Sequence, residues 1–352
     1  MKKPGKRLIW AGVFALITAG TVALALLLPG FWFSFYTDFS HYSIYFLGTV
    51  LSLCPVPVWE ILLVLLVLTM IGCLVWAVRK HRIPGFLAML LEINLLGVML
   101  FMLLWGLNHF APPIGEQINL NVRKYSATQL EQAAAWYAEQ ASALSTQVKR
   151  DAGGEVVPPS ISEQSETAVA AYKLLGAENS RFKRTAPVVK PLMGSTLSAE
   201  MGTTGIYLCL TGEAAVSTKT YGLTQPFTVC HELGHSLAVA REDEANYLAF
   251  LACRASEDEL FRYSGYYCAF LYCYNAINEE NPDVAAGLWE HCSEQMRKDS
   301  NQHVSHDKQF EGSLRDTAQS VNDTYLKTFN EAGVKSYGLV VDYLVTEYLQ
   351  NH

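Results

Sequence analysis

Three long apolar runs in the first third of the chain constrain its fold most, because each is long enough to cross a membrane. The first run, Leu8–Leu28, holds no charged residue, and a hydrocarbon core of about 30 Å needs roughly 20 such residues in a helix. The second is Ile61–Val78. The third, about Ile83–Leu107, contains Glu92 and Asn94, polar groups that at such depth usually face other helices. Tryptophans placed as interfacial anchors lie near the ends of the second run: Trp59 and Trp76. We therefore expect three N-terminal transmembrane helices.

The basic residues predict how these helices are oriented. KKPGKR, residues 2–7, precedes the first run, RKHR, residues 79–82, separates the second from the third, and Pro29–Glu60 contains no lysine or arginine. By the positive-inside rule, the N-terminus and the 79–82 loop are cytoplasmic. Three crossings then place everything after Asn108 outside the cytoplasm, in a multi-pass protein of the cell membrane. The alternative is that Leu8–Leu28 is a cleaved signal peptide. It is less favoured because the run is long for an h-region and no Ala-x-Ala site stands at its end.

The two parts of the chain differ in charge. Of the 352 residues, 51% are hydrophobic and 17% charged, an apolar composition for a soluble protein. Residues 1–112 carry seven Lys or Arg and three acids, a net charge of +4, whereas residues 113–352 carry 19 bases and 30 acids, a net charge of −11. We therefore expect a membrane domain over residues 1–112, in contact with the lipid bilayer, and a second domain over residues 113–352. The negative charge of the second domain, and the lack of a basic stripe with interleaved aromatic residues, argue against nucleic acid as a partner.

Residues 113–352 are enough to bury one good hydrophobic core, and their pattern predicts a mainly α-helical domain with a small β element. Ser126 and Gln129 form a capping-box-like start, followed by apolar residues at helical spacing. The clearest strand is GIYLCLTG, residues 205–212, which is short and bounded by glycines. After Pro226 the pattern is helical to the end. Other expected features are a loop at 151–163, a helix at 165–175, and helix breaks near 279–283 and 331–333.

Six of the eight cysteines belong to the second domain: Cys209, Cys230, Cys253, Cys268, Cys273 and Cys292. An oxidising exterior would permit disulfides, but none of the six falls in a CxxC pair. We therefore favour the interpretation that most of them are small buried hydrophobic side chains, and their redox state stays open.

The stretch PFTVCHELGHSLAVAREDEANYLAFLAC, residues 226–253, carries the strongest chemical signal. His231 and His235 are one helical turn apart, so both imidazoles can reach one ion. Glu232 is rotated by about 100° from His231, which keeps it out of the ligand set but beside a metal-bound water. Zinc lowers the pKa of that water towards 7, and a nearby carboxylate can take its proton. The pattern therefore predicts a zinc site with Glu232 as the general base. The alternative is a helix whose histidines are surface or packing residues.

A third ligand separates these two interpretations, and Glu242 and Glu244 are the candidates. On an uninterrupted helix Glu242 would lie about 10 Å further along the axis than His235, beyond coordination distances near 2 Å. The site therefore requires the helix to end between about residues 237 and 241 and the chain to double back into a second helix. Glu242 and Asn246 are four apart on one face, as a ligand and its hydrogen-bonding partner should be, and we favour Glu242 over Glu244.

The spacing of HELGH and EDEAN resembles that of the gluzincin-type zinc metallopeptidases, in which a glutamate from a following helix is the third ligand. The whole chain resembles an uncharacterised bacterial membrane family, catalogued as domain of unknown function 3810. The matching features are three N-terminal spans ending in WGLNHF, then TGIYLCLTGEAAV, the 226–253 stretch, RYSGYY, VNDTYLK and GVKSYGLVVDYL. The family pattern has glycine at the third place after the second histidine, where the chain could turn, and this sequence has Ala238.

This resemblance implies a zincin-like helical metallopeptidase domain that holds one zinc ion and hydrolyses peptide bonds of a peptide or protein substrate. It also implies that the 205–212 strand is an edge strand that lies beside the metal and pairs with an extended substrate; an internal core strand is the alternative. An electrophile for the tetrahedral oxyanion would be expected, and the tyrosines of RYSGYY are candidates: Tyr263, Tyr266 and Tyr267.

Two other classes of function remain as alternatives. A membrane-tethered binding or sensory protein would keep the metal for structure and cut nothing. A transporter that uses Glu92 and Asn94 is disfavoured because three spans are few for a transport pathway. His303 and His306 lie in a polar stretch, and we expect them to be solvated rather than metal-bound.

Overall fold

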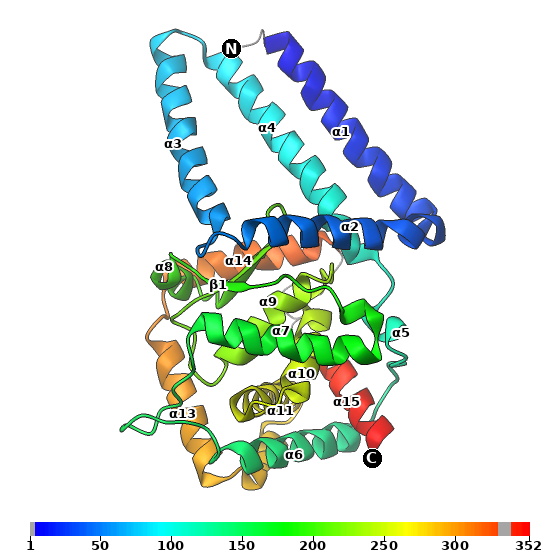
Figure 1. Cartoon of the computed structure of the whole chain (residues 1–352), viewed down its shortest axis with the longest axis vertical. Coiled ribbons are helices and arrows are strands. Elements are labelled where there is room, and N and C mark those ends of the chain that lie inside the picture. The colour runs from blue at the N-terminus through cyan, green and yellow to red at the C-terminus, as the bar shows by residue number, and fades with distance from the viewer. Residues whose placement is uncertain (1–3, 330–338) are drawn as a thin grey trace.

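The computed structural model describes residues 4–329 and 339–352, and it is mainly helical with one small sheet (Figure 1). Three helices are long and apolar enough to cross a membrane: α1 (Pro4–Leu27), α3 (Val58–Arg79) and α4 (Ile83–Leu104). They coincide with the three predicted spans, and Figure 1 shows them extending together from one end of the molecule. The expected membrane helices are thus confirmed by length and composition.

The spans differ in how closely they pack. α1 and α4 lie against each other, and α3 contacts α4 less extensively. Glu92 of α4 forms an ion pair with Arg7 of α1, so it faces another helix as expected. Asn94 is instead exposed, and its side chain donates to the carbonyl oxygen of Leu90 one turn earlier (2.8 Å). The start of α1 and the α3–α4 loop lie at the end of the molecule that is opposite the globular part, residues 113–352 (Figure 1).

The connection between the first two spans is itself a helix, α2 (Pro29–Leu51), which runs across the ends of the spans and lies on the globular part (Figure 1). Its buried residues recur every three or four positions and so share one face: Trp32, Tyr36, Ser40, His41, Ile44 and Gly48. Gly48 contacts the backbone of Gly212 so closely that a Cβ atom on either glycine would collide with the other segment. The His41 ring Nε2 lies 2.7 Å from the carbonyl oxygen of Arg184. α2 is therefore docked on the globular part.

A three-stranded sheet lies beside α2. Its strand order is β1 (Val189–Pro191), β3 (Glu213–Val216), β2 (Gly205–Leu208), with β1 parallel and β2 antiparallel to β3. β2 ends at Leu208, whose carbonyl oxygen accepts from the N–H groups of Thr211 (3.1 Å) and Gly212 (2.8 Å). Gly212 has a positive φ of 67°, a conformation that glycine adopts without steric cost. The predicted strand over 205–212 is therefore a short edge strand followed by a tight turn.

A buried ion pair joins this sheet to the membrane part. Nζ of Lys190, on β1, lies 2.6 Å from Oε1 of Glu213, on β3, and both side chains are almost completely buried. Their other partners are backbone groups of the α2–α3 connection: the carbonyl oxygens of Leu51 (2.8 Å) and Val56 (3.2 Å), which accept from Lys190, and the N–H groups of Val58 (2.9 Å) and Trp59 (3.1 Å), which donate to Glu213. Hydrogen bonds in the interior thus fix the start of α3 to the globular part.

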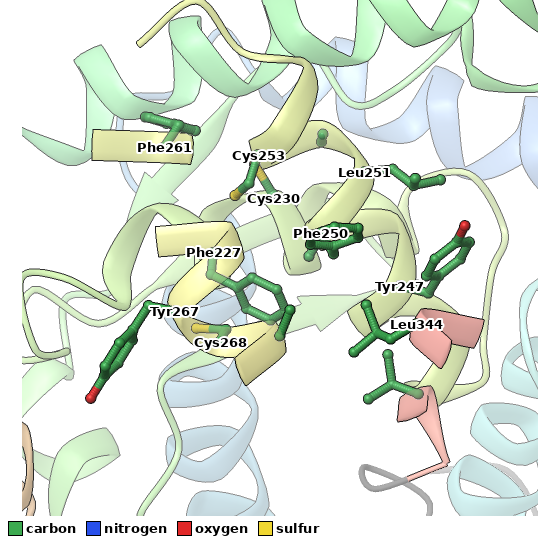
Figure 2. Packing of buried hydrophobic residues seen from close by; sticks show 14 of the residues in the cluster. Phe227, Cys230, Tyr247, Phe250, Leu251, Cys253, Phe261, Tyr267, Cys268 and Leu344 are labelled. Carbon is green, nitrogen blue, oxygen red and sulfur yellow. The ribbon is translucent and has the colours of Figure 1, made fainter. Parts of the chain in front are cut away.

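The core of the globular part is formed by six helices: α6 (Ala127–Leu144), α7 (Ile161–Glu178), α9 (Gln225–His235), α10 (Glu242–Ala255), α11 (Glu259–Glu280) and α15 (Val340–Asn351). α11 lies in the middle and packs against α6, α9 and α10. The predicted capping box of Ser126 and Gln129 starts α6. Aromatic and aliphatic side chains from α9, α10, α11 and α15 interdigitate in this core (Figure 2). One continuous apolar interior therefore surrounds α9 and α10.

The remaining elements connect these helices: η1 (Gly106–Phe110), α5 (Ile114–Gln117), η2 (Ser180–Phe182), α8 (Ser195–Glu200), α12 (Pro282–Leu288), η3 (Trp289–His291), α13 (Glu294–Lys308) and α14 (Ser313–Thr328). The predicted break near 279–283 is the α11–α12 junction, and the one near 331–333 lies outside the described residues. All eight cysteines fall in the described part of the chain and are unpaired, and the six of the globular part are buried. Cys230 and Cys253 face each other between α9 and α10 (Figure 2).

Candidate metal centre

Helix α9 carries the HELGH sequence and is held tightly by its neighbours. Pro226 stands in its first turn, where a missing N–H group leaves no helical hydrogen bond unmade. Gly234 faces Tyr172 of α7, whose hydroxyl donates to the carbonyl oxygen of Cys230 (2.9 Å). A Cβ atom at position 234 would lie 2.9 Å from that hydroxyl oxygen. The glycine of HELGH therefore lets α7 approach α9, which fixes the position of the two histidines.

The histidine side chains converge on one point. The Nε2 atoms of His231 and His235 are 3.1 Å apart, and the two rings are perpendicular, with centroids 4.7 Å apart. Only 12% and 7% of these side chains are exposed. Two ring nitrogens at this distance need a proton or a cation between them, because two lone pairs facing each other repel.

The chain turns back directly after the second histidine. α9 ends at His235 and α10 begins at Glu242, so the helix break required for a third ligand is present. The N–H of Ala238 donates to the carbonyl oxygen of His235 (2.9 Å), and Ala238 has a φ of +60°. This left-handed conformation suits glycine and is costly for other residues. Ala238 makes this turn although it is not a glycine.

The turn brings Glu242 to the histidines. Its Oε2 atom lies 3.2 Å from Nε2 of His231 and 3.8 Å from Nε2 of His235. Ligand atoms bound to zinc at 2.0–2.1 Å in a tetrahedral arrangement are about 3.3 Å apart. The three observed separations, 3.1, 3.2 and 3.8 Å, lie around this value, so the residues fit a zinc ion. Two histidines and one carboxylate leave one coordination position for a water, the usual ligand count of a catalytic zinc site.

Each histidine has a neighbouring group that can orient its ring. Nδ1 of His235 lies 2.8 Å from the carbonyl oxygen of Val239, which can only accept, so this nitrogen carries the proton and Nε2 presents a lone pair. Asn246, one turn after Glu242 on α10, is buried, and it contributes to raising the pKa of His231. Such partners orient metal-bound histidines and strengthen their binding. The structure therefore places Asn246 beside the histidines, where the sequence predicted it.

The ionisation of the three groups reflects their burial and mutual charges. Burial lowers the pKa of His235 to about 4, so this ring is neutral at pH 7. Burial acts in the same direction on His231, but the hydrogen bond and charge of Glu242 outweigh it and raise the pKa of His231. For Glu242, burial alone would raise the pKa, but the two histidines outweigh it and lower the pKa. The carboxylate is thus ionised and attracts positive charge into the site, as metal binding requires.

Glu232 is the next residue on α9 after His231, and it is 5% exposed. Burial raises the pKa of its carboxyl group to about 8, with a smaller opposing effect from His231. The first residue of β2, Gly205, lies directly against this carboxyl group, since a Cβ atom at position 205 would be 2.5 Å from Oε1 of Glu232. A carboxyl group with a pKa near neutrality, held between a helix and an edge strand, is suited to accept and return a proton.

Glu244 has a different place from Glu242. Its Oε1 atom accepts from the backbone N–H of Ile114 (2.8 Å) and the hydroxyl of Tyr343 (3.3 Å), and it forms an ion pair with Arg241. These contacts connect the first turn of α10 to α5 and α15. Of the two candidate carboxylates, the structure brings Glu242 to the histidines and uses Glu244 to hold the helix.

The tyrosines of RYSGYY do not reach the site. The hydroxyl of Tyr263 donates to Oδ2 of Asp299 (2.6 Å), and the hydroxyl of Tyr267 lies 3.1 Å from Nδ1 of His303. Tyr266 packs against the rings of Trp136 (5.7 Å) and Phe250 (5.8 Å). In the described residues these contacts face α6, α10 and α13, so the structure does not bring the three tyrosines to the converging histidines. Their spacing along α11 serves packing in the core.

The two histidines of HVSH are also placed differently from expectation. His303 stacks on Tyr221, with ring centroids 4.9 Å apart, and His306 lies 5.6 Å from the same ring. Their side chains are 21% and 26% exposed. They are packed rather than freely solvated, and neither belongs to the group formed by His231, His235 and Glu242.

Three aromatic residues that the sequence did not single out border the site. The rings of Trp105 and Tyr207 lie 5.7 Å and 6.1 Å from the His235 ring. The charge of His109 contributes to lowering the pKa values of both His235 and Glu242. The hydroxyl of Tyr207 is buried and has no hydrogen-bond partner among the described residues. Trp105 and His109 belong to WGLNHF, residues 105–110. The change there from an apolar span to polar and aromatic residues is the sequence signal that could have indicated them.

The chain matches the family model described as "Protein of unknown function (DUF3810)" over residues 35–345, nearly its full length, and it belongs to that family. No curated protein and no solved structure shows significant similarity to it.

Proposed function

We propose that this member of the DUF3810 family is a membrane-anchored zinc metallopeptidase with a zincin-like helical domain, residues 113–352, that hydrolyses peptide bonds outside the cytoplasm. The observation that carries the proposal is the convergence of Nε2 of His231, Nε2 of His235 and Oε2 of Glu242 at the spacing of tetrahedral zinc ligands. Glu232, the residue after the first histidine, is buried near this point and is not one of the three converging groups.

In this proposal the residues of the chain have separate tasks. Zinc, when bound, polarises the peptide carbonyl and acidifies a water molecule. Glu232 takes the proton of that water as it attacks and then delivers it to the nitrogen of the departing amine. His231, His235 and Glu242 bind the ion, and Val239 and Asn246 orient the two rings.

Strand β2 supplies a binding surface next to these groups. β3 takes one edge of β2, and no other described strand covers its second edge, so an extended peptide can pair there. Gly205 lies beside Glu232 and Tyr207 beside His235, so the strand passes along the site. Burial raises the pKa of Tyr207 well above its usual value, which keeps the hydroxyl protonated. We assign to this unpartnered donor the stabilisation of the tetrahedral oxyanion, in place of the three tyrosines of α11.

The proposed location follows from the charges at the two ends of the spans. The start of α1, which carries Lys6 and Arg7, and the α3–α4 loop with the basic residues at 79–82 lie at the end opposite the globular part (Figure 1). The positive-inside rule places that end in the cytoplasm and the globular part on the other side of the cell membrane. Alkaline phosphatase fused after residue 352 should therefore be active in cells, and an inactive fusion protein would refute the orientation.

The decisive experiment compares the wild type with Glu232→Gln. The purified full chain should bind one zinc per molecule, and the double substitution His231→Ala/His235→Ala should lose it. Glu232→Gln keeps the shape and removes the basicity, so zinc content should stay at one equivalent while peptide turnover falls by about two or more orders of magnitude. A chelator-treated wild type is the control for metal dependence.

The same experiment tests the non-catalytic alternative. A tethered binding or sensory protein needs the metal for structure only, and it gives the Glu232 carboxylate no chemical task. In that case the zinc-loaded wild type and Glu232→Gln would be indistinguishable with every peptide or protein offered, and the peptidase proposal would be abandoned.

A further inference from the structure

We infer that the substrates are proteins anchored in the same membrane, and that they are cut a short, fixed distance from its outer surface. This inference rests on the proposed peptidase function. It concerns which peptides reach the site and from which side, and it follows from the position of the site relative to α2 and the end of α4.

The site lies directly beneath the membrane part. The residues that follow His235 pack in one apolar cluster with the end of α4 and with α2: Ala238 and Ala240 lie with Trp105, Ile44 and Cys209. Trp105, the residue after α4, is also the ring beside His235. The candidate metal ligands are therefore separated from α2 by about one layer of side chains.

The exposed face of α2 has the character of a membrane-surface helix. Its large apolar residues recur at helical spacing opposite the buried face, each between 45% and 65% exposed: Phe31, Phe35, Phe39, Tyr42, Phe46 and Val50. Asp38 is the one charged residue in α2. α2 connects the end of α1 to the start of α3, so its level is that of the span ends (Figure 1). Aromatic residues concentrate at the interface between lipid and water. We therefore assign the lipid surface as the partner of this exposed apolar face of α2.

The other sides of the site are closed by the core. α9 is covered by α7, α10 and α11, and the side chains of His231, His235 and Glu242 are only 12%, 7% and 14% exposed. The edge of β2 is the part of the site's border that no described strand covers. Its far end turns at Gly212, which contacts Gly48 of α2. A peptide paired with β2 therefore runs between the site and the membrane surface.

This arrangement determines how many residues must separate the membrane from the bond that is cut. β2 ends at Leu208, directly after Tyr207, so the strand extends only about 3 Å beyond Tyr207 before its turn reaches α2 at Gly212. The width of α2 adds about another 10 Å before lipid is reached. An extended chain leaving the bilayer needs about four to eight residues to cover this distance. A segment much closer to the membrane would not reach the site, whereas a distant one would have to fold back.

The test uses the full zinc-loaded chain in lipid vesicles. A library of randomised peptide segments is attached to a single membrane-spanning helix through flexible linkers of 2, 6, 12 and 24 residues, and the same library is offered without the helix. Mass spectrometry identifies the bonds that are cut. We expect the anchored library to be cut at least about tenfold faster, since anchoring raises the local concentration. We also expect cuts about four to eight residues from the helix with the linkers of 2 and 6 residues, and much slower cutting of the segments behind the linkers of 12 and 24 residues.

Two substitutions on the exposed face of α2, Phe35→Glu and Phe46→Glu, test the role of the lipid surface. They should slow cutting of the anchored library at least about threefold, because charged side chains oppose the seating of α2. Leu174→Glu, a change of the same kind at an exposed apolar residue of α7, is the matched control and should have no effect.

The outcomes separate the two proposals. Equal rates for the anchored and free libraries, or cuts that follow sequence regardless of distance from the helix, would overturn the membrane inference and leave the peptidase intact. Equal effects of the α2 and Leu174 substitutions would also count against it. If neither library is cut, and Glu232→Gln behaves as wild type, the peptidase proposal itself fails and the inference falls with it.

Discussion

Two clusters of buried charged groups lie within the globular part, and they differ in whether the chain satisfies them. The ammonium group of Lys190 has three acceptors, and the carboxylate of Glu213 accepts from this ammonium group and from two backbone N–H groups. In the cluster of His231, His235 and Glu242, by contrast, three atoms that can each present a lone pair converge, and a proton on His231 would bond to only part of the group. The first cluster is complete without any ligand, whereas the second needs a proton or a cation between its ligand atoms.

This difference separates a structural role from a chemical one. A buried charge with all its hydrogen bonds made stabilises the fold when both partners are present. Converging buried acceptors destabilise the fold unless a proton or a cation lies between them, so such a cluster is a candidate for binding a cation. Both clusters lie near the membrane part. The Lys190–Glu213 pair fixes the start of α3 to the sheet. Trp105, at the end of α4, packs beside His235.

The largest expected effect is on the satisfied pair. Lys190→Met removes one partner and leaves the Glu213 carboxylate buried without its cation, which should lower the free energy of unfolding by about 3–5 kcal/mol. The double substitution Lys190→Met/Glu213→Leu removes both charges and should recover at least half of this loss. Denaturant unfolding of the detergent-solubilised protein measures both values. A loss below about 1 kcal/mol for Lys190→Met would show that the pair does not fix the two parts together.

The second prediction compares Glu242→Gln with Glu244→Gln. Changing an outer partner of a ligand costs about 10–100-fold in metal affinity, so loss of the ligand Glu242 should cost more than a hundredfold. The zinc-free form of Glu242→Gln should also lose stability near neutral pH, because the lowered pKa of Glu242 and the raised pKa of His231 mean that the folded state favours their ion pair. Glu244→Gln should keep its zinc affinity and lose about 1–3 kcal/mol of stability, because its bonds to Arg241 and Ile114 weaken. The opposite pattern would exchange the two assignments.

A smaller change tests how closely β2 meets the base. The Cβ atom of Gly205→Ala would lie 2.5 Å from Oε1 of Glu232, so the carboxyl group or the strand must shift. We expect peptide turnover to fall by about a hundredfold with zinc content unchanged, since a displacement of about 1 Å at a reacting group has this effect. Gly287→Ala serves as the control, because position 287 on α12 has open space for a Cβ atom. Full turnover in Gly205→Ala would mean that β2 does not constrain Glu232.

Local patterns in the sequence predicted the parts of this comparison that depend on short-range geometry. Apolar runs of about 20 residues identified the three spans, and the spacing of HELGH predicted the roles of His231, Glu232 and His235. The requirement that a third ligand lie within about 4 Å forced a helix break after His235, even though no glycine or proline marks it. Here a distance limit predicted more than residue propensity did.

The parts that depend on tertiary contacts could not be predicted. The aromatic residues of α2 alternate between an exposed face and a face buried on the globular part, and a sequence alone does not show which partner each face has. Tyr207 and Tyr263 have the same side chain, but the fold places one beside His235 and gives the other Asp299 as a partner. Lys190 and Glu213 are 23 residues apart, and they meet only because β1 and β3 are neighbours.

The smallest expected effect concerns the turn that makes the second cluster possible. Ala238 has a φ of +60°, where a Cβ atom costs roughly 1–2 kcal/mol, and its neighbour Val239 supplies the carbonyl oxygen that fixes His235. Ala238→Gly removes this strain but gives the unfolded chain more freedom, which offsets part of the gain. The net stabilisation should be about 0.5–1 kcal/mol in thermal or denaturant unfolding, with zinc affinity and turnover unchanged.

Leu237→Ala, which shortens a large buried side chain in the same turn, should destabilise by about 2–5 kcal/mol and is the control for the sensitivity of the measurement. If Ala238→Gly lowered zinc affinity, the alanine would be needed for more than the turn, through its packing against Trp105 and Ile44. The site would then depend on its contact with the membrane part.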